Sequence, residues 1–91
     1  MSWIEADGTL SRDIRTTDFL SSFRLVSALV APAEALGHHP DLAFGWGFVR
    51  ISLTTHDAGG VTELDRELAA RFDPVIAAFL AECHADVTKP L

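Results

Sequence analysis

Two adjacent histidines followed by a proline, with a third histidine further along, are the residues of this sequence best suited to acid–base chemistry. His38 and His39 precede Pro40, His56 lies downstream, and the whole chain has only four histidines. An imidazole can donate or accept a proton near neutral pH, because its unperturbed pKa is about 6.5. Two or three imidazoles around one pocket could therefore protonate a leaving hydroxyl group and remove a proton elsewhere on the same substrate.

Two carboxylates, Glu34 and Asp65, could support such a pocket. Either could fix the tautomer of a neighbouring imidazole or raise its pKa. Each also has a structural explanation, since Asp65 is the third residue after a helix cap at Thr62 and Glu34 could be a solvated acid in a last helical turn. No serine or cysteine stands out as an activated nucleophile. Elimination or hydration therefore fits these residues better than acyl transfer.

A metal site is the main alternative interpretation of the same residues. Three histidines and a carboxylate are a legitimate ligand set for zinc. However, Pro40 favours an extended backbone at His39, so the two adjacent imidazoles should diverge rather than converge on one ion. A pair of histidines four residues apart on a helix is also absent from the sequence. We therefore expect no metal and no cofactor, and favour acid–base chemistry.

Composition limits the class of protein. A chain of 91 residues with 48% hydrophobic residues should form one domain over positions 1–91. The net charge is −6 and the seven basic residues are scattered, which argues against direct nucleic-acid binding. One cysteine, Cys83, cannot form a disulfide within the chain. No basic leader followed by an apolar run is visible, and no run approaches the length of a spanning helix, so we expect a cytoplasmic protein without membrane contact.

The sheet elements are suggested by turn residues and by alternation. The stretch 3–6, the turn Asp7-Gly8 and the stretch 9–15 are typical of a β-hairpin, because both turn residues tolerate positive φ. A single long strand is predicted over 42–55, with alternate residues from Val49 to Leu53 facing the helices. A further short strand could lie within 41–45, or another subunit could supply the missing pairing.

Two stretches have helical periodicity. The first helix is expected to be capped by Thr17 or Asp18 and to end at Gly37. Its core-facing stripe is expected to be Phe19, Phe23, Val26 and Val30, widened by Leu20, Leu29 and Ala33. A proline inside a helix costs about 3 kcal/mol, so a kink or restart is expected near Pro32. The second helix begins at Thr62, a further helix is expected to begin at Pro74 after an Asp73 cap, and 86–91 is expected to be a frayed tail. The fold class is α+β, an antiparallel sheet with helices packed on one face.

Seven positions together resemble the pterin-4a-carbinolamine dehydratases. The pattern is an acid, three residues, His-His-Pro, five residues, an aromatic, nine residues, a histidine, eight residues and an aspartate. The positions that carry it are Glu34, His38, His39, Pro40, Trp46, His56 and Asp65. The resemblance extends over roughly 3–72.

This resemblance implies a four-stranded antiparallel sheet backed by helices, assembled as a homodimer or homotetramer. It also implies the dehydration of 4a-hydroxytetrahydropterin to quinonoid dihydropterin, in a pathway shared with an aromatic amino-acid hydroxylase. His38, His39 and His56 would line the pterin site, His38 and His56 for proton transfer and His39 mainly for positioning the ring. Glu34 and Asp65 would be supporting carboxylates, and Pro40 would hold the loop.

Members of this family also act as dimerisation or assembly factors, so a non-enzymatic binding protein is the alternative function. Its contact surface could be the face of the predicted long strand that carries Phe48, Arg50 and Ser52. Trp46 could be a substrate-binding residue, as the pattern implies, or simply a large residue in a strand.

Overall fold

The computed structural model describes the backbone of residues 3–87 and the side chains of residues 3–82. Within that part of the chain lie four strands, two long helices and one short 3₁₀ helix. In chain order these are β1 (Ile4–Ala6), β2 (Thr9–Arg15), α1 (Phe19–Leu36), β3 (Asp41–Gly45), β4 (Phe48–Leu53), η1 (His56–Ala58) and α2 (Glu63–Val87).

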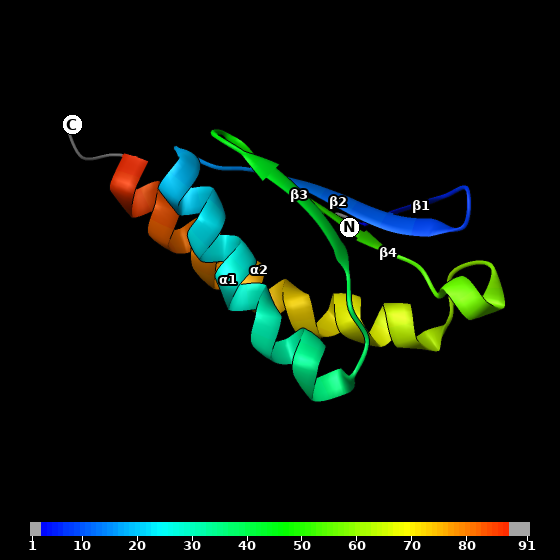
Figure 1. The fold of residues 1–91 in the computed structure, drawn as a ribbon. Coiled ribbons are helices and arrows are strands. Elements are labelled where there is room, and N and C mark those ends of the chain that lie inside the picture. Colours follow the sequence, from blue (N-terminus) through cyan, green and yellow to red (C-terminus); the bar gives the residue numbers. More distant parts are fainter. Residues whose placement is uncertain (1–2, 88–91) are drawn as a thin grey trace.

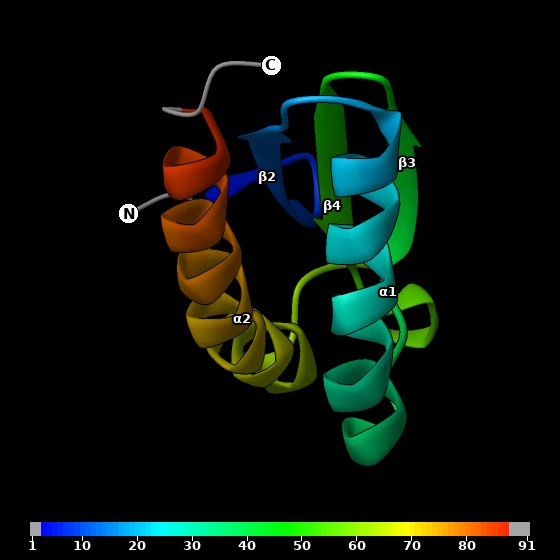
Figure 2. The ribbon, with the colours of Figure 1, turned by 90° about the vertical axis from the view of Figure 1, so that its left-hand side faces the viewer.

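The strands form one antiparallel sheet in the order β1-β2-β4-β3, and both long helices cover the same face of it (Figures 1 and 2). The α+β fold expected from the sequence is therefore confirmed. The hairpin between β1 and β2 turns at Asp7 and Gly8, which both have positive φ, as predicted. β4 lies between β2 and β3, with Val49 opposite Ile14 and Leu53 opposite Leu10.

The single strand predicted over 42–55 is wrong, because the chain reverses direction within it. β3 and β4 form a hairpin in which Gly45 pairs with Phe48 across the turn at Trp46 and Gly47. A Cβ added to Gly45 would lie 2.7 Å from the Phe48 ring, so the close approach of the two strands favours glycine. The short strand considered within 41–45 is thus β3. As a result, β4 returns towards the end of α1 and carries His56 back to His38.

The core lies between the sheet and the two helices. Val49, Ile51 and Leu53 of β4 are fully buried, as the alternation predicted, and they contact Leu10 and Ile14 of β2 in the same apolar cluster. The helices contribute the remaining buried apolar side chains, which are Leu25, Leu29, Ala33, Leu68, Ala69, Phe72 and Ile76.

The core-facing stripe predicted for α1 is only partly right, because the buried face is rotated about the helix axis relative to it. Leu29 and Ala33 are buried as predicted. The fully or almost fully buried residues are Ser22, Leu25, Leu29 and Ala33, whereas Phe19, Phe23 and Val30 are each more than half exposed. The start of the helix fixes this rotation. The Asp18 side chain caps the helix by accepting from the Ser21 amide, and the Ser22 hydroxyl bonds both Thr16 and the Asp18 carbonyl. An apolar row on the outer face of α1 is therefore left exposed within the described part of the chain.

Neither interior proline ends a helix. Pro32 lies within a continuous α1 and Pro74 within a continuous α2. The restart considered at Pro32 and the new helix predicted at Pro74 are therefore wrong, and the kink considered at Pro32 stays a prediction. The lost hydrogen bond at each proline is offset by burial of Leu29 and Ala33 around Pro32, and of Phe72 and Ile76 around Pro74.

Asp73 does not cap a new helix. Its carboxylate instead accepts from the Trp3 indole at 2.7 Å and from Arg12 at 3.1 Å, which ties α2 to the β1–β2 hairpin. The tail predicted for 86–91 is helical as far as Val87, and its last four residues lie outside the described residues.

By length and mean hydropathy, α1 is apolar enough to cross a membrane, contrary to the expectation from the sequence. It has 18 residues and a mean hydropathy of 1.4. A long core helix passes the same test, and here Leu25 and Leu29 are fully buried in the apolar cluster that α1 shares with the sheet and α2. Packing therefore accounts for the apolar residues on the inner face of α1.

Gly37 ends α1 in the left-handed conformation, with φ 69° and ψ 27°, as predicted. We expect Gly37→Ala to lower the free energy of unfolding by about 1 kcal/mol, because only the backbone conformation is penalised. A Cβ at this position would meet no atom within 4 Å. Urea denaturation measures the change, and Gly37→Asn is the matched control because asparagine tolerates this conformation better. An equal loss in both variants would contradict the backbone explanation.

Candidate functional site

The end of α1, the end of β4 and the start of α2 meet at one end of the molecule (Figure 1). A cavity of about 430 Å³ lies there, and all three predicted histidines line it. The end of α1 contributes His38 and His39, and the segment after β4 contributes His56. The remaining lining residues are Gly37, Thr54, Thr55, Asp57 and Leu64.

His38 is held by a buried carboxylate. Its Nε2 lies 2.6 Å from Oδ1 of Asp65, which is fully buried in the first turn of α2. The His38 side chain itself is 13% exposed, so a small part of it remains open to solvent. Gly37 brings the chain to this point, because the left-handed turn directs it away from α1 immediately before His38.

Asp65 accepts hydrogen bonds from three separate segments of the chain. Besides His38, the Thr55 hydroxyl donates to its Oδ2 at 2.8 Å and the Thr62 amide donates to the same oxygen at 2.9 Å. Burial of this carboxylate raises its pKa, but the bonds from His38, Thr62 and Thr55 outweigh burial and hold the pKa below its ordinary value. Asp65 is therefore an anion at neutral pH and can only accept. The Thr62–Asp65 bond also confirms the predicted helix start.

The charge of Asp65 fixes which His38 nitrogen carries the proton in the neutral ring. Because the carboxylate has no hydrogen to give, Nε2 must be the donor in the 2.6 Å bond. The Nδ1 lone pair is then the part of the neutral ring that can accept a proton. An imidazolium formed at His38 would be stabilised by the adjacent anion.

His39 and His56 are in more open surroundings. His39 Nε2 lies 2.7 Å from Oε2 of Glu34, but both side chains are more than half exposed, so this pair is a surface interaction. His56 begins η1 and is exposed. The structure therefore separates the two adjacent histidines, as the proline-induced divergence predicted: His38 contacts α2 and His39 contacts α1.

Four of the seven predicted residues are not among those that line the cavity. Two of them, Glu34 and Asp65, bond His39 and His38, and the other two are Trp46 and Pro40. Trp46 occupies the turn between β3 and β4, at the end of the hairpin away from the histidines, and it is 71% exposed. Pro40 is half-buried just before β3, directly after the histidine pair. The structure thus brings His38, His39, His56, Glu34 and Asp65 together, and within one chain it does not bring Trp46 to them.

The geometry does not suggest a metal centre in the described part of the chain, where no three histidine, cysteine, aspartate or glutamate side chains converge on one point. The two carboxylates instead bond different imidazoles on opposite sides of the loop that follows α1.

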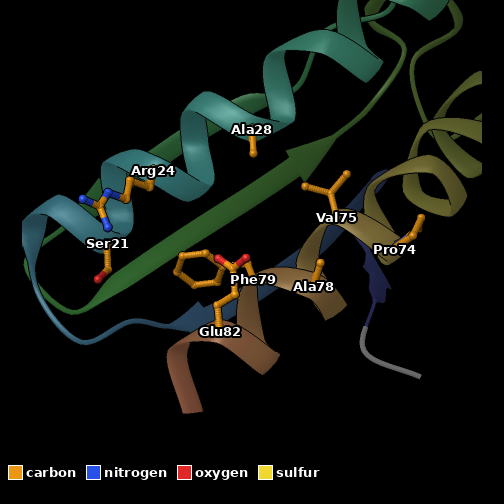
Figure 3. Close-up of a pocket in the computed structure, with 8 residues that line it drawn as sticks. All are labelled: Ser21, Arg24, Ala28, Pro74, Val75, Ala78, Phe79 and Glu82. Atoms are coloured by element: carbon orange, nitrogen blue, oxygen red, sulfur yellow. The ribbon is translucent and has the colours of Figure 1, made fainter. Parts of the chain in front are cut away.

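A larger cavity of about 530 Å³ lies between α1 and α2 (Figure 3). Its titratable side chains are Arg24 and Glu82, one on each helix, and both are exposed. Apolar side chains such as Val75 and Phe79 make up much of the remaining wall. Among the residues whose side chains the structure describes, none in this lining titrates near neutral pH, so proton transfer is better supported at the histidine cavity.

The sequence reasoning did not identify Thr55 as a site residue. Its hydroxyl bonds Asp65 and also lies 2.7 Å from the Thr62 hydroxyl. A threonine after a strand is too common a pattern to indicate such a role, and only the meeting of β4 with α2 reveals it.

Comparison with known proteins places these features in a family. Residues 1–75 match the family model described as pterin 4 alpha carbinolamine dehydratase. A protein from Picosynechococcus sp., named "Putative pterin-4-alpha-carbinolamine dehydratase", is 42% identical over 71 residues, covering 78% of this chain and 77% of the relative. A protein of the same name from Thermosynechococcus vestitus is 46% identical over 67 residues, covering 74% and 70%.

Solved structures agree with the sequence comparison. A transcriptional coactivator/pterin dehydratase from Brucella melitensis is similar with a TM-score of 0.73 and 30% identity, covering 81% of each chain. A pterin dehydratase-like protein identified as a RuBisCO assembly factor in the alpha-carboxysome is similar with a TM-score of 0.66 and 28% identity, covering 82% of this chain and 89% of that one. The family match and the curated relatives together show that this chain belongs to the pterin-4a-carbinolamine dehydratase family.

Proposed function

We propose that this protein catalyses the dehydration of 4a-hydroxytetrahydropterin to quinonoid dihydropterin, within a single domain spanning residues 1–91. The observation that supports this proposal is the presence of three imidazoles on the wall of one cavity, one of them bonded to a buried anion. A cavity of about 430 Å³ is in the ordinary size range for a small-molecule site. Family membership supports the same chemistry.

The reaction needs one proton donor and one proton acceptor. The C4a–O bond breaks, the leaving hydroxyl takes a proton from a general acid, and water departs. A general base removes the N5 proton, and the N–H electron pair forms the C4a=N5 double bond. No net proton is consumed, so histidines that exchange protons with solvent suffice.

We assign the proton transfers to His38 and His56, and mainly ring positioning to His39. Asp65 would orient His38. Glu34, which is exposed, would restrain the His39 ring through the hydrogen bond between them. Pro40 would keep the loop extended between the histidine pair and β3. A contribution of Trp46 to substrate binding would need another subunit, since Trp46 lies at the far end of its own hairpin.

Stopped-flow kinetics tests the proposal. A hydroxylase generates 4a-hydroxytetrahydropterin in the presence of a tetrahydropterin cofactor, and absorbance follows its decay with and without the purified protein. Acceleration proportional to protein concentration is the expected result. A decay rate equal to the spontaneous one would reject the enzymatic proposal.

A non-enzymatic assembly role is the second candidate, favoured by the similarity to the RuBisCO assembly factor. The two candidates differ in whether the histidines matter. A variant with His38, His39 and His56 all replaced by alanine should lose dehydration, whereas a purely structural binding role should survive in it. Retained binding to a defined partner in this variant would support the second candidate.

We also propose that the protein is a cytoplasmic homodimer or homotetramer that works in sequence with an aromatic amino-acid hydroxylase, the class of reaction that supplies the carbinolamine. The outer row of α1 supports self-association, since Phe23 and Val30 are each 52% exposed beside exposed Leu20.

Light scattering on the purified protein should therefore give a mass of two or four chains, and Phe23→Ser should shift it towards the monomer. Exposed Leu64, near the histidine cavity, offers a matched control in Leu64→Ser, which should leave the mass unchanged. A monomeric wild-type protein would contradict self-association.

A further inference from the structure

Thr55 lies between two partners that determine the direction of its hydrogen bonds. Its Oγ1 is 2.8 Å from Oδ2 of Asp65 and 2.7 Å from Oγ1 of Thr62. The Asp65 carboxylate is anionic and accepts only, so the Thr55 hydroxyl hydrogen must point to it. The Thr55 oxygen is then free to accept the hydrogen of the Thr62 hydroxyl.

The chain of donors therefore runs in one direction, from Thr62 to Thr55 to Asp65. The Thr62 amide donates to the same carboxylate oxygen at 2.9 Å, so Oδ2 is held by two donors from two segments of the chain. This arrangement restrains rotation of the carboxylate and leaves Oδ1 directed at His38 Nε2. No carboxylate is better restrained among the described ion pairs, since the other acidic partners are at least half exposed.

We propose that Thr55 is a positioning residue that keeps His38 in the Nε2–H tautomer, so that His38 Nδ1 is the base that removes the N5 proton. The reaction step in this inference rests on the proposed function, whereas the assignment of the tautomer does not depend on it. In that step Nδ1 takes the proton and the N5 electron pair forms the C4a=N5 bond. The imidazolium that results is stabilised by Asp65 until it returns the proton to solvent.

Thr55 also connects the end of β4 to the start of α2, so a loss of stability alone would not distinguish positioning from packing. Thr55→Val keeps the shape and removes the hydroxyl, and Thr55→Ser restores the hydroxyl on a smaller side chain. Thr16→Val is the matched control, because Thr16 is equally half-buried and also bonds a second hydroxyl, that of Ser22. Thr16 lies at the opposite end of the sheet, where its amide bonds the Gly47 carbonyl.

The experiment combines long-range ¹H–¹⁵N correlation spectra of the histidine rings with the stopped-flow assay and urea denaturation. We expect the neutral wild-type His38 ring to be the Nε2–H tautomer. In Thr55→Val the Asp65 carboxylate loses one of the two donors to Oδ2 and can turn away from His38, so we expect a mixture of tautomers. In Thr55→Val we expect kcat to fall about tenfold with little change in KM, the usual scale for a residue that orients a functional histidine. Thr55→Ser should restore both the tautomer and kcat, and Thr16→Val should change stability only.

Two results would overturn the proposal. One is an Nδ1–H tautomer of the neutral His38 ring in the wild-type protein. This result would reject the proposal even if Thr55→Val does not fold. The other is a Thr55→Val protein with the wild-type tautomer and wild-type kcat. If the wild-type protein does not accelerate dehydration, the proposed function fails, and the spectra still show whether Thr55 sets the tautomer of His38.

Discussion

Alanine at His38 or at His56 is expected to slow the dehydration of 4a-hydroxytetrahydropterin by about a hundredfold or more, the usual contribution of a general acid or base. The reason is that each variant removes one of the two proton-transfer groups while the cavity and the rest of its wall remain. The loss should appear in kcat, because the missing interaction belongs to the transition state rather than to substrate binding. Stopped-flow decay at saturating substrate measures it.

His39→Ala is the matched comparison, since it removes the same side chain from the adjacent position. His39 is 60% exposed, and among the described residues its side chain bonds only the exposed Glu34. We therefore expect a higher KM and a kcat closer to that of the wild type. Near-wild-type rates in both His38→Ala and His56→Ala would reject the assignment of proton transfer to these residues. A kcat loss in His39→Ala as large as in His38→Ala would reject the division of roles.

Asp65→Asn is expected to reduce both activity and stability. The asparagine oxygen can accept from Thr55 and Thr62, but its amide group then faces His38 and must donate to it. The ring is driven into the other tautomer, with the hydrogen on Nδ1. We expect kcat to fall between about 10²- and 10⁴-fold, because a base in the wrong tautomer cannot accept the proton.

The stability effect of Asp65 should depend on pH. At neutral pH we expect Asp65→Asn to lower the free energy of unfolding by about 1–3 kcal/mol, the usual cost of a mismatched buried polar group. The pKa of Asp65 is lowered in the folded protein, mainly because bonds from His38, Thr62 and Thr55 outweigh the opposing effect of burial.

A lowered pKa means that ionisation of Asp65 stabilises the fold above the unfolded value of about 3.9, and that this stabilisation is lost as the pH falls through the lower folded value. Urea denaturation of both proteins from pH 7 to pH 3 measures the difference. If the difference in free energy of unfolding between wild type and Asp65→Asn stays constant over this pH range, the stabilising role of the Asp65 charge is contradicted.

The site was easier to predict from the sequence than the topology that assembles it. His38, His39 and His56 stood out by residue type and spacing, and the structure places them on one cavity. The hairpin between β3 and β4 did not stand out, because apolar residues continue through Phe44 and Trp46 and hide the turn. Gly45 and Gly47 on either side of Trp46 were the local signal for it.

The rotation of α1 could be predicted only in part, because two faces of the helix are apolar. The predicted stripe included the buried Leu29 and Ala33 but was centred on the exposed row. One row runs Phe19, Phe23, Val26 and Val30, and the other runs Leu25, Leu29 and Ala33, and both have helical spacing. Only the cap at Asp18 and the contacts of the sheet select the second row for the core. The predictions of a helix restart at the two prolines failed for a related reason. A proline inside a helix loses a hydrogen bond, and tertiary packing can offset this cost by an amount that cannot be estimated from the sequence.

The residues that line the histidine cavity are half-buried or exposed, whereas the side chains that fill the core are buried. The residues of the site and the residues of the core are therefore almost entirely different. A lineage could therefore replace the histidines without much cost to folding, which gives a physical route from a catalyst to a binding protein on the same scaffold. Asp65 is the exception, because it is buried and also bonds His38. A descendant that abandoned the chemistry would still be under pressure to keep this carboxylate, or to rebuild the start of α2 around its replacement.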